Sequence, residues 1–233
     1  MRTLAPLALA AVLAPGTAVQ PRPALEARDV AQPERALQAR FPGNMAFAIT
    51  DGTTTLMSDF PYESGYSRYM TYDAALVRSA TASTLSLITH RHGDHWERSL
   101  FNATDWKIAG PADVTTGINR SRVVPLEGTG TFGPMRLEAL DTPHASVGHY
   151  SYIVTWHGRR LYFTGDTEST ERLLAAKNLD VAFVSPWLYQ AVRRARLQID
   201  AKQIVIYHHE SGQRVPECEQ GCTVPRQGDV LRF

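Results

Sequence analysis

The sequence predicts an α/β fold with two β-sheets and with helices on their outer sides. Hydrophobic strand segments alternate with helical segments along the chain, and this order is typical of sheets that are covered by helices. The pair Asp51-Gly52 between two short apolar segments indicates a β-hairpin near the start of the folded region. With 233 residues, of which 43% are hydrophobic and 20% charged, the chain can form one substantial domain.

The first half of the predicted fold opens with that hairpin. Its strands are expected over residues 45–50 and 53–58, and Asp59 ends the second strand. The elements expected next are, in chain order, a helix over 72–80, strands over 85–88 and 106–109, a helix over 111–118 with proline at its first turn, and a strand over 122–126.

The second half of the predicted fold begins near Gly130. Two of its strands are joined by a turn at His157-Gly158. No internal repeat is legible in the residues, so the sequence alone does not relate the two halves. The expected elements are strands over 135–139, 150–156, 160–164, 181–185 and 204–207, and helices over 169–177 and 188–197.

The N-terminus has the composition of a secretory signal. Arg2 precedes an apolar stretch over residues 4–14, and Gly16-Thr17-Ala18 offers small residues where a signal peptidase needs them. We expect cleavage after Ala18 and export to the periplasm or the cell exterior. A stretch of 11 apolar residues that contains Pro6 falls well short of the ~20 needed to span a bilayer, so stable membrane insertion is not expected.

Residues 19–40 are expected to link residues 1–18, the predicted signal peptide, to a domain over 41–233. Three prolines lie in this segment among alanine, glutamate, arginine and glutamine. The net charge of +1 argues against a nucleic-acid partner, because phosphate binding needs a concentrated basic patch. The one basic cluster, Arg193, Arg194 and Arg196, fits a solvated helix face.

The two cysteines of the chain, Cys218 and Cys222, are separated by three residues. Two thiols with no histidine nearby make only half a metal site, and in an exported chain they favour a disulfide. A ring this small would hold one loop and would not staple the whole fold.

The densest polar cluster follows the strand expected over 85–88. Residues 89–95 read Thr-His-Arg-His-Gly-Asp-His and place three imidazoles and one carboxylate within six positions, although the chain has only 8 histidines. Imidazole is the commonest protein metal ligand, and a divalent cation would reconcile side chains that otherwise compete for protons. His90 and His92 would leave the strand on one side, while Gly93 allows a turn towards a second ion. The pattern favours a metal site over a polar surface loop.

This segment resembles the His-x-His-x-Asp-His signature of the metallo-β-lactamase-fold hydrolases and matches it in full as His90-Arg91-His92-Gly93-Asp94-His95. The resemblance implies a four-layer αββα sandwich built from two similar halves, with metal ions at the sheet edge. It also implies further ligands downstream. The ordered match covers residues 44–210.

The downstream ligands that the resemblance implies each follow an expected strand. His144 stands where the family supplies its third imidazole, and Asp166 follows a strand and Gly165 as the family's bridging carboxylate does. His208 or His209 would complete the second site, and we prefer His208. One ion would then be held by His90, His92 and His144, the other by Asp94, His95 and His208, and both by Asp166.

Other positions near the motif keep two interpretations. Asp59 is expected either near the metal site or as a turn cap. The tyrosine-rich segment over 64–72 either lies over the site or covers the edge of the core. His149 is either a substrate contact or a surface residue, and His149 or His157 could help to protonate a leaving group.

The resemblance implies a metal-dependent hydrolase that acts on a small molecule, and the predicted signal peptide implies that this hydrolase is exported. Two cations about 3.5 to 4 Å apart would lower the pKa of a shared water, so that metal-bound hydroxide attacks an ester, lactone or phosphodiester, with Asp94 orienting it and accepting its proton. The single hairpin entry and the short tyrosine-rich loop look more like the lactonase and phosphodiesterase branch. Lactam hydrolysis and an iron-binding oxidoreductase of the same fold are the alternatives. Two Zn²⁺ ions are expected, with Mn²⁺ or iron as alternatives, and the oligomeric state stays open.

We predict that the mature protein is exported, begins at Val19 and carries a Cys218 to Cys222 disulfide. Intact-mass analysis with thiol labelling measures both features, and a reduced sample serves as the positive control for labelling. Recovery of an uncleaved Met1 from the cytosol, or two freely labelled thiols in exported material, would contradict the prediction.

Overall fold

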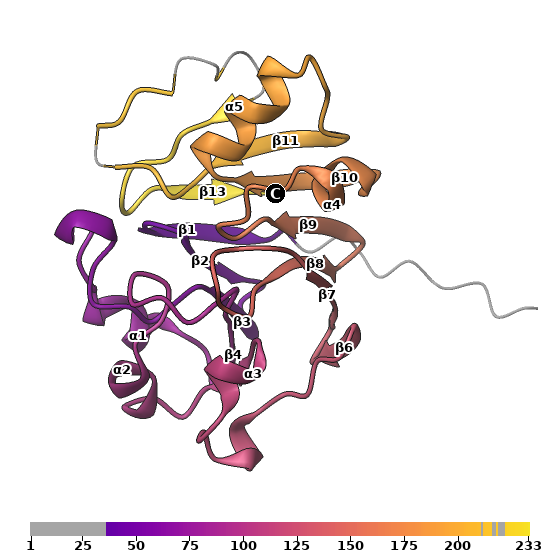
Figure 1. The fold of residues 1–233 in the computed structure, drawn as a ribbon. Coiled ribbons are helices and arrows are strands. Elements are labelled where there is room, and N and C mark those ends of the chain that lie inside the picture. The colour runs from indigo at the N-terminus through magenta and orange to yellow at the C-terminus, as the bar shows by residue number, and fades with distance from the viewer. Residues whose placement is uncertain (1–35, 211, 216–217, 219–221) are drawn as a thin grey trace, which may run out of the picture. The chain divides into compact units, whose positions relative to one another are not determined.

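The computed structural model describes residues 36–210, 212–215, 218 and 222–233. The predicted signal peptide over 1–18 and most of the predicted linker therefore lie outside the described residues. In the described part the chain forms two β-sheets (Figure 1).

The first sheet has six strands in the described residues, in the order β13-β1-β2-β3-β4-β5. The pairs from β13 to β3 are antiparallel, whereas β3, β4 and β5 run parallel to one another. The strands are β1 Gln38–Gly43, β2 Ala46–Thr50, β3 Thr54–Ser58, β4 Ser83–Leu87, β5 Lys107–Ala109 and β13 Val230–Arg232.

The second sheet has seven strands in the same described part, in the order β12-β11-β10-β9-β8-β7-β6. Strands β6 to β9 form antiparallel pairs, and β9, β10, β11 and β12 run parallel. The strands are β6 Thr129–Phe132, β7 Met135–Asp141, β8 Tyr150–Trp156, β9 Arg159–Phe163, β10 Leu179–Val184, β11 Ala201–Ile206 and β12 Cys222–Thr223.

The helices are short and lie between the strands. Among the described residues every helix falls short of the length and apolar character that a bilayer crossing requires. The helices are α1 Ala74–Ser79, α2 Arg98–Asn102, α3 Ala112–Thr115, α4 Glu171–Ala175 and α5 Pro186–Arg194, with 3₁₀ turns at Tyr66–Arg68 and Arg120–Arg122.

The two sheets pack face to face through alternate strand positions. In β8, Tyr152 and Val154 point into the central core, while Ile153 belongs to a separate cluster with α4 and α5. Across the central core, Phe47 of β2 meets Phe183 of β10 with ring centroids 4.6 Å apart. Each such side chain contributes about 1.5 to 3 kcal/mol when buried. A third cluster joins the outer face of the first sheet to α1, α2 and α3, so the predicted four-layer αββα sandwich is confirmed.

The predicted hairpin is present as β2 and β3. The Asp51 carboxylate accepts hydrogen bonds from the backbone N–H groups of Thr53 and Thr54, both at 2.8 Å, and Gly52 has a φ of +89°. Glycine tolerates this left-handed conformation, which explains why the Asp-Gly pair predicted the turn.

The strand predicted over 122–126 is wrong. Arg120–Arg122 form a 3₁₀ turn, and the segment makes only an isolated bridge between Ile108 and Val123. Arg122 turns back and donates to the backbone oxygens of Trp106 at 2.9 Å and Phe101 at 3.1 Å. These bonds hold the segment against α2 and β5, which periodicity alone does not reveal.

The sequence also missed several elements, among them β1, β6, β12, β13 and α2. β1 begins at Gln38, inside the predicted linker, and its inward Ala39 is fully buried in the core. The N-terminus of α2 is capped by Glu97, whose carboxylate accepts from the backbone N–H of Ser99. The boundary at residues 40 and 41 stays a prediction, although core packing already includes residues before it.

The carboxyl ends of parallel strands from both sheets meet at one edge of the sandwich. Hydrogen bonds join the sheets there. The Tyr152 hydroxyl donates to the backbone oxygen of Ile88 at 2.7 Å, and the N–H of Tyr150 donates to that of Thr89 at 3.0 Å. The segments that follow β4, β7, β9 and β11 therefore emerge side by side.

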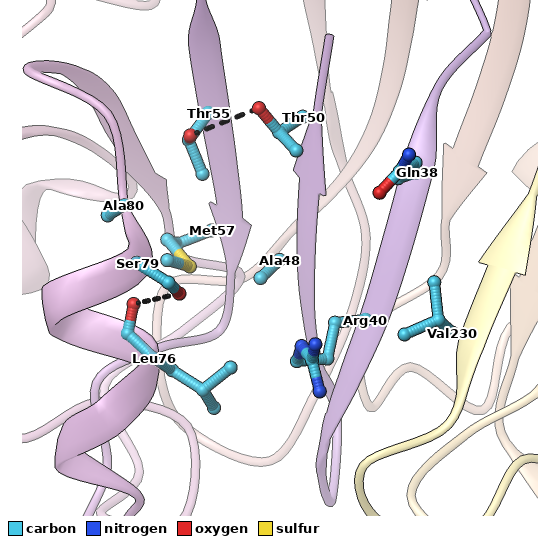
Figure 2. Close-up of a pocket in the computed structure, with 10 residues that line it drawn as sticks. All are labelled: Gln38, Arg40, Ala48, Thr50, Thr55, Met57, Leu76, Ser79, Ala80 and Val230. Carbon is cyan, nitrogen blue, oxygen red and sulfur yellow. Dashed lines mark hydrogen bonds between the residues drawn. The ribbon is translucent and has the colours of Figure 1, made fainter. Parts of the chain in front are cut away.

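A hollow on the outer side of the first sheet lies between α1 and strands β1 and β2 (Figure 2). The small side chains of Ala48 and Ala80 are among those that line it. None of the predicted metal ligands lines this hollow, so it is separate from the edge described above. Its lining residues are Gln38, Arg40, Ala48, Thr50, Thr55, Met57, Leu76, Ser79, Ala80 and Val230.

At the opposite edge, a buried pair joins the hairpin turns of the two sheets. Asp51 Oδ2 lies 2.7 Å from His157 Nε2, and the side chains are 1% and 6% exposed. Burial acts to raise the pKa of Asp51, but hydrogen bonds from His157, Thr53 and Thr54 outweigh it and lower that pKa below 3.8. This carboxylate therefore stabilises the fold above about pH 4, and its contribution is lost as the pH falls further.

We predict that His157→Ala lowers the free energy of unfolding by about 2 to 3 kcal/mol at pH 7, because it leaves the buried Asp51 carboxylate without its partner. Urea unfolding measures the change, and the difference from wild type should shrink as Asp51 becomes protonated in acid. Lys202→Ala is the control. It removes a pair with Asp180 that also spans 2.7 Å but whose lysine is exposed, and it should cost about 1 kcal/mol or less. Equal losses in the two variants would contradict the prediction.

Candidate metal centre

The seven side chains predicted as metal ligands come together at the edge where the strand ends meet. Four segments deliver them, which follow β4, β7, β9 and β11. Within each of three groups, the candidate ligand atoms all lie within 4.8 Å of one another. The groups are His90, His92 and His144; His90, His95 and Asp166; and Asp94, His95 and His208.

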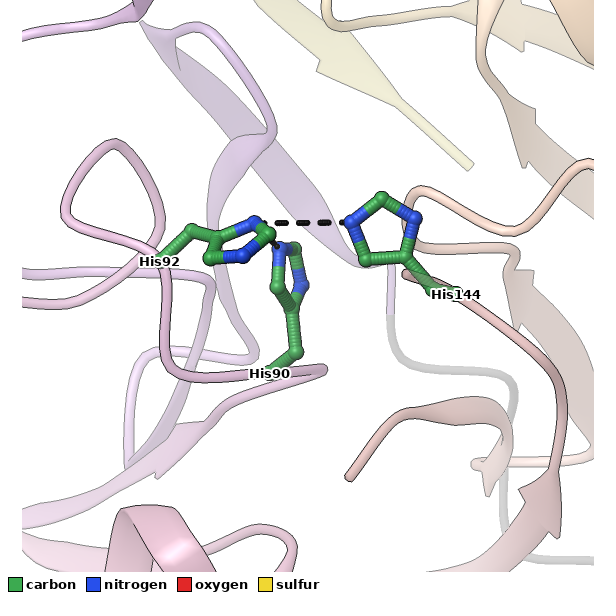
Figure 3. Close-up of side chains that lie close together, drawn as sticks. All are labelled: His90, His92 and His144. Carbon is green, nitrogen blue, oxygen red and sulfur yellow. Dashed lines mark hydrogen bonds between the residues drawn. The ribbon is translucent and has the colours of Figure 1, made fainter. Parts of the chain in front are cut away.

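The first group consists of three imidazoles from both halves of the fold. His90 and His92 come from the segment after β4, and His144 reaches them from the segment after β7 (Figure 3). His90 Nε2 lies 2.8 Å from His92 Nδ1, which lies 3.4 Å from His144 Nε2. Three ring nitrogens that converge in this way offer three lone pairs to one cation.

We call Asp94, His95 and His208 the second group, and it combines a carboxylate with two imidazoles. Asp94 Oδ2 lies 3.4 Å from His208 Nε2 and 3.7 Å from His95 Nε2. His95 is fully buried, whereas Asp94 retains 20% exposure of its side chain. One oxygen and two nitrogens thus surround a point that solvent can reach.

Asp166 stands between the two groups. It follows β9 and Gly165, and its Oδ2 lies 3.3 to 4.0 Å from the Nε2 atoms of four histidines. Two of these histidines, His90 and His144, belong to the first group, and the other two, His95 and His208, belong to the second. The structure therefore brings the predicted bridging carboxylate to a position from which it can reach both.

Several buried polar atoms of the cluster lack a hydrogen-bond partner among the described residues. They include both ring nitrogens of His95, Oδ1 of Asp166 and Nε2 of His208. Carboxylate oxygens lie 3.3 to 3.7 Å from the nitrogens of His95 and His208, within ion-pair distance, but these contacts are not hydrogen bonds. Buried polar atoms are normally paired, so these atoms fit a centre completed by cations.

The charge states of the cluster fit the same interpretation. Burial, and then the neighbouring His95, lowers the pKa of His90, so His90 is neutral at pH 7. For Asp166, burial acts to raise the pKa, but His95 and His208 outweigh burial and lower it. Neutral imidazole and ionised carboxylate are the forms that bind a divalent metal.

Protons compete with metal for the second group. Burial acts to lower the pKa of His208, but Asp166 and Asp94 raise it to about 9. Without a cation, protonated His208 therefore stabilises the carboxylates fully below pH 6.5, and this contribution is lost as the pH rises through about 9. Metal binding must displace that proton, so metal affinity is expected to decrease as the pH is lowered.

Asp59 lies beside the predicted metal ligands, the first of the two interpretations that the sequence left open, and its carboxylate bonds to the distant Thr89 instead of capping its own turn. It is fully buried, and its Oδ1 accepts hydrogen bonds from the backbone N–H of Thr89 at 2.7 Å and from the Thr89 hydroxyl at 3.0 Å. Its Oδ2 lies 3.6 Å from His95 Nδ1. Asp59 thus fixes the start of the motif and turns the other nitrogen of His95 towards the cluster.

His149 is neither a surface residue nor open to substrate, because its side chain is buried against the Asp166 segment. Its Nε2 accepts from the backbone N–H of Asp166 at 3.0 Å, and its Nδ1 lies 2.8 Å from the Thr142 hydroxyl. Gly165 leaves room for this contact, since a Cβ there would lie 2.3 Å from His149 Nε2. His149 therefore holds the backbone of Asp166, the predicted bridging carboxylate, in place.

Backbone groups fix the donor and the acceptor of every hydrogen bond in the series that runs from the Asp166 amide through His149, Thr142 and Ser151 to the Thr164 carbonyl. The amide of Asp166 can only donate, and the carbonyl oxygen of Thr164 can only accept, here from Ser151 at 2.6 Å. The Thr142 hydroxyl must then donate to Ser151, and Nδ1–H of His149 must donate to Thr142. The order assigns the proton of His149 to Nδ1 and leaves Nε2 free for Asp166.

His208 and His209 point to different sides of their segment. His208 turns to the cluster, where Trp187 of α5 lies against its ring with centroids 5.0 Å apart. His209 stacks on Phe41 at 5.6 Å, and its Nδ1 lies 3.0 Å from the backbone oxygen of Glu210. The geometry agrees with the preference for His208.

The remaining predictions have separate outcomes. The turn His157-Gly158 lies at the far end of β8, so His157 is not part of the cluster and cannot protonate a leaving group there. The tyrosine-rich segment does reach the site, since the Tyr69 hydroxyl donates to Asn44 beside Asp94. Sequence reasoning missed Asn44 and Trp187 because no spacing rule links them to the motif.

The Cys218 to Cys222 disulfide is present, with Cα atoms 5.3 Å apart. Cys222 begins β12, which pairs with β11 through Ile204. The disulfide therefore ties Cys218 to a strand of the second sheet.

We predict that His208→Ala loses about one equivalent of bound metal and most turnover, because each ion of a two-metal site acts on a different oxygen. His209→Ala should keep both equivalents, since its ring lies against Phe41. Metal content after dialysis, measured on both variants, decides between them. Loss of metal from His209→Ala alone would overturn the assignment, and loss from neither would contradict a dinuclear centre.

Comparison with known proteins supports a metal-dependent hydrolase of the metallo-β-lactamase fold. No family model matches the chain. A UPF0173 metal-dependent hydrolase from Deinococcus radiodurans is 30% identical over 164 residues, which cover 64% of this chain and 71% of that protein. The metallo-β-lactamase fold protein YhfI from Bacillus subtilis has a TM-score of 0.64 at 12% identity, with 85% of this chain and 100% of that chain covered.

A second solved structure with the same fold is a different kind of enzyme. CmlA, a diiron β-hydroxylase from Streptomyces venezuelae, has a TM-score of 0.58 at 14% identity, with 87% of this chain and 55% of that chain covered. At such identities the structures establish the fold alone, whereas the relative from D. radiodurans establishes the family. The chain, a metallo-β-lactamase-fold protein with five histidines and two aspartates gathered at one edge of the sandwich, belongs to the UPF0173 family of metal-dependent hydrolases.

Proposed function

We propose that this metal-dependent hydrolase cleaves an ester, lactone or phosphodiester bond of a small molecule with two divalent metal ions. The observation that carries the proposal is the position of Asp166, whose Oδ2 lies within 4.0 Å of imidazoles from both ligand groups. One ion would be held by His90, His92 and His144, the other by Asp94, His95 and His208, and both by Asp166.

The donor set suits zinc. The seven side chains offer nitrogen and carboxylate oxygen with no thiolate, a set that zinc, manganese and iron all accept. The fold also occurs in a diiron hydroxylase, so metal identity separates hydrolysis from oxidation. We propose Zn²⁺ in a hydrolase because the family relative is a metal-dependent hydrolase.

Divalent metal at this position would acidify water and polarise the bond to be cleaved. Asp94 supplies the protein's part of the reaction. Burial acts to raise its pKa, but the neighbouring His208 and His95 outweigh burial and lower the pKa. Asp94 is therefore ionised at neutral pH, and its partly exposed carboxylate can orient an attacking water and take its proton.

The surroundings of the cluster fit a small substrate. A hollow is lined by Pro143, His144, Ala145, Glu168 and Ser169, so one residue of the first ligand group faces it. We also propose that the protein works outside the cytoplasm. Residues 1–18 have the composition of a signal peptide, and a disulfide such as Cys218 to Cys222 is stable in an oxidising compartment.

We predict that Asp94→Asn lowers kcat by about 100-fold or more on the best substrate of a lactone, ester and phosphodiester panel, because an amide cannot accept the proton. Steady-state kinetics on zinc-loaded protein measure the loss, and metal content measured in parallel separates it from loss of metal. Asp105→Asn, an exposed aspartate away from the cluster, is the control and should match wild type.

Three outcomes would contradict the proposal. Full turnover by Asp94→Asn would remove the assigned role of this carboxylate. Wild-type protein that is inactive on the whole panel when loaded with zinc would exclude the proposed bond types. Iron as the metal of protein purified without added metal, together with oxygen-dependent turnover, would favour the oxidoreductase alternative.

A further inference from the structure

We propose that Asn44 is a positioning residue that holds Asp94 and His208, two ligands of the second group, in a fixed relation to each other. This inference rests on the proposed two-metal function. It assigns a role to a side chain that lies outside the ligand motif and comes from the turn between β1 and β2.

Asn44 is fully buried at the edge where the ligands meet. Its φ is +50°, in the left-handed region that asparagine tolerates better than most residues. Burial of an amide without partners costs free energy, so the bonds that the side chain makes explain its presence. All of them lead to the metal centre or to the loop beside it.

The amide group reaches the carboxylate that we propose to orient water. Asn44 Nδ2 donates to the backbone oxygen of Asp94 at 2.7 Å and lies 3.5 Å from Asp94 Oδ2. Asn44 Oδ1 accepts from the Tyr69 hydroxyl at 3.1 Å. A flipped amide would place its oxygen against two oxygens of Asp94, so the bonds fix the orientation.

The backbone of the same residue reaches the other ligand. The carbonyl oxygen of Asn44 accepts from the backbone N–H of His208 at 2.6 Å. His208 follows β11 of the second sheet, and it also has a left-handed φ, of +54°. Asn44 thus connects Asp94 from the segment after β4 with His208 from the segment after β11, which belong to different sheets.

The loop that carries Tyr69 is packed on the same turn. The backbone N–H of Asn44 points to Met70 Sδ at 3.0 Å. Gly43 has a φ of +127°, and a Cβ there would lie 2.5 Å from Met70 Cβ, so only glycine allows this approach. The Tyr69 hydroxyl is therefore held where it fixes the amide of Asn44.

Two substitutions separate the amide from the backbone. Asn44→Gly keeps the left-handed turn and removes the side chain. Asn44→Asp keeps size and tolerance of the φ but replaces the donor with a charged oxygen beside Asp94. Groups that orient metal ligands affect metal affinity by about 10- to 100-fold. We therefore expect both variants to bind the second metal equivalent about 10- to 100-fold more weakly, with the first equivalent unchanged.

The experiment titrates the full metal-free chain with Zn²⁺ against a competing chelator, and with Co²⁺ followed by its visible absorption bands. Tyr69→Phe should weaken the second equivalent less than Asn44→Gly, because it removes only the bond that orients the amide. Asn178→Asp is the matched control. Asn178 also has a left-handed φ, of +54°, but it is exposed in the turn before β10, so this variant should match wild type.

The outcomes separate this inference from the proposed function. Wild-type affinity for the second equivalent and an unchanged Co²⁺ spectrum in both Asn44 variants would overturn the positioning role alone. Equal weakening of both equivalents, with a lower thermal midpoint, would show a merely structural role and would also overturn it. A wild-type chain that binds fewer than two equivalents would overturn the two-ion function and the inference together.

Discussion

The structure depends on a buried carboxylate among four imidazoles. Asp166 is 8% exposed, and its Oδ2 faces the Nε2 atoms of His90, His95, His144 and His208. A charge removed from water costs several kcal/mol unless other charges and hydrogen bonds compensate for it. The segments around Asp166 supply that compensation. His149 accepts the backbone N–H of Asp166, and Gly165 makes the approach of that imidazole sterically feasible.

The imidazoles that surround Asp166 come from both sheets. The predicted metal ligands of the first sheet follow β4, those of the second sheet follow β7, β9 and β11, and each of the two predicted metal sites draws on both sheets. Hydrogen bonds across the edge, such as that from Tyr152 to Ile88, place the two sets within reach of each other. The apolar contacts of the central core, such as Phe47 with Phe183, therefore serve the site indirectly by fixing how the sheets stack.

The parts of the site that could be predicted are those encoded locally. The motif at residues 90–95, His144 and Asp166 each follow a strand that hydrophobic periodicity identifies, and the resemblance to a known family orders them. Asn44 could not be predicted in this way, since its partners Tyr69, Asp94 and His208 are distant in sequence. The strand expected over 122–126 failed for a related reason, because Arg122 bonds to Trp106 and Phe101. Local propensity does not report such contacts.

The buried polar groups at the two edges of the sandwich differ in how fully they are paired. At the ligand edge, protonated His95 and His208 offset the carboxylates when no metal is bound, and several buried atoms have no hydrogen-bond partner among the described residues. At the opposite edge, Asp51 and His157 satisfy each other directly, without a metal ion. Natural folds commonly concentrate unsatisfied groups where they bind a ligand and compensate elsewhere. The pair of Asp51 and His157 joins the hairpin turns of both sheets, so it can hold their stacking independently of the predicted metal ligands. On this view the metal centre is preorganised by contacts that do not themselves touch the metal, and Asp59, His149 and Asn44 are the side chains that carry this constraint to the ligands.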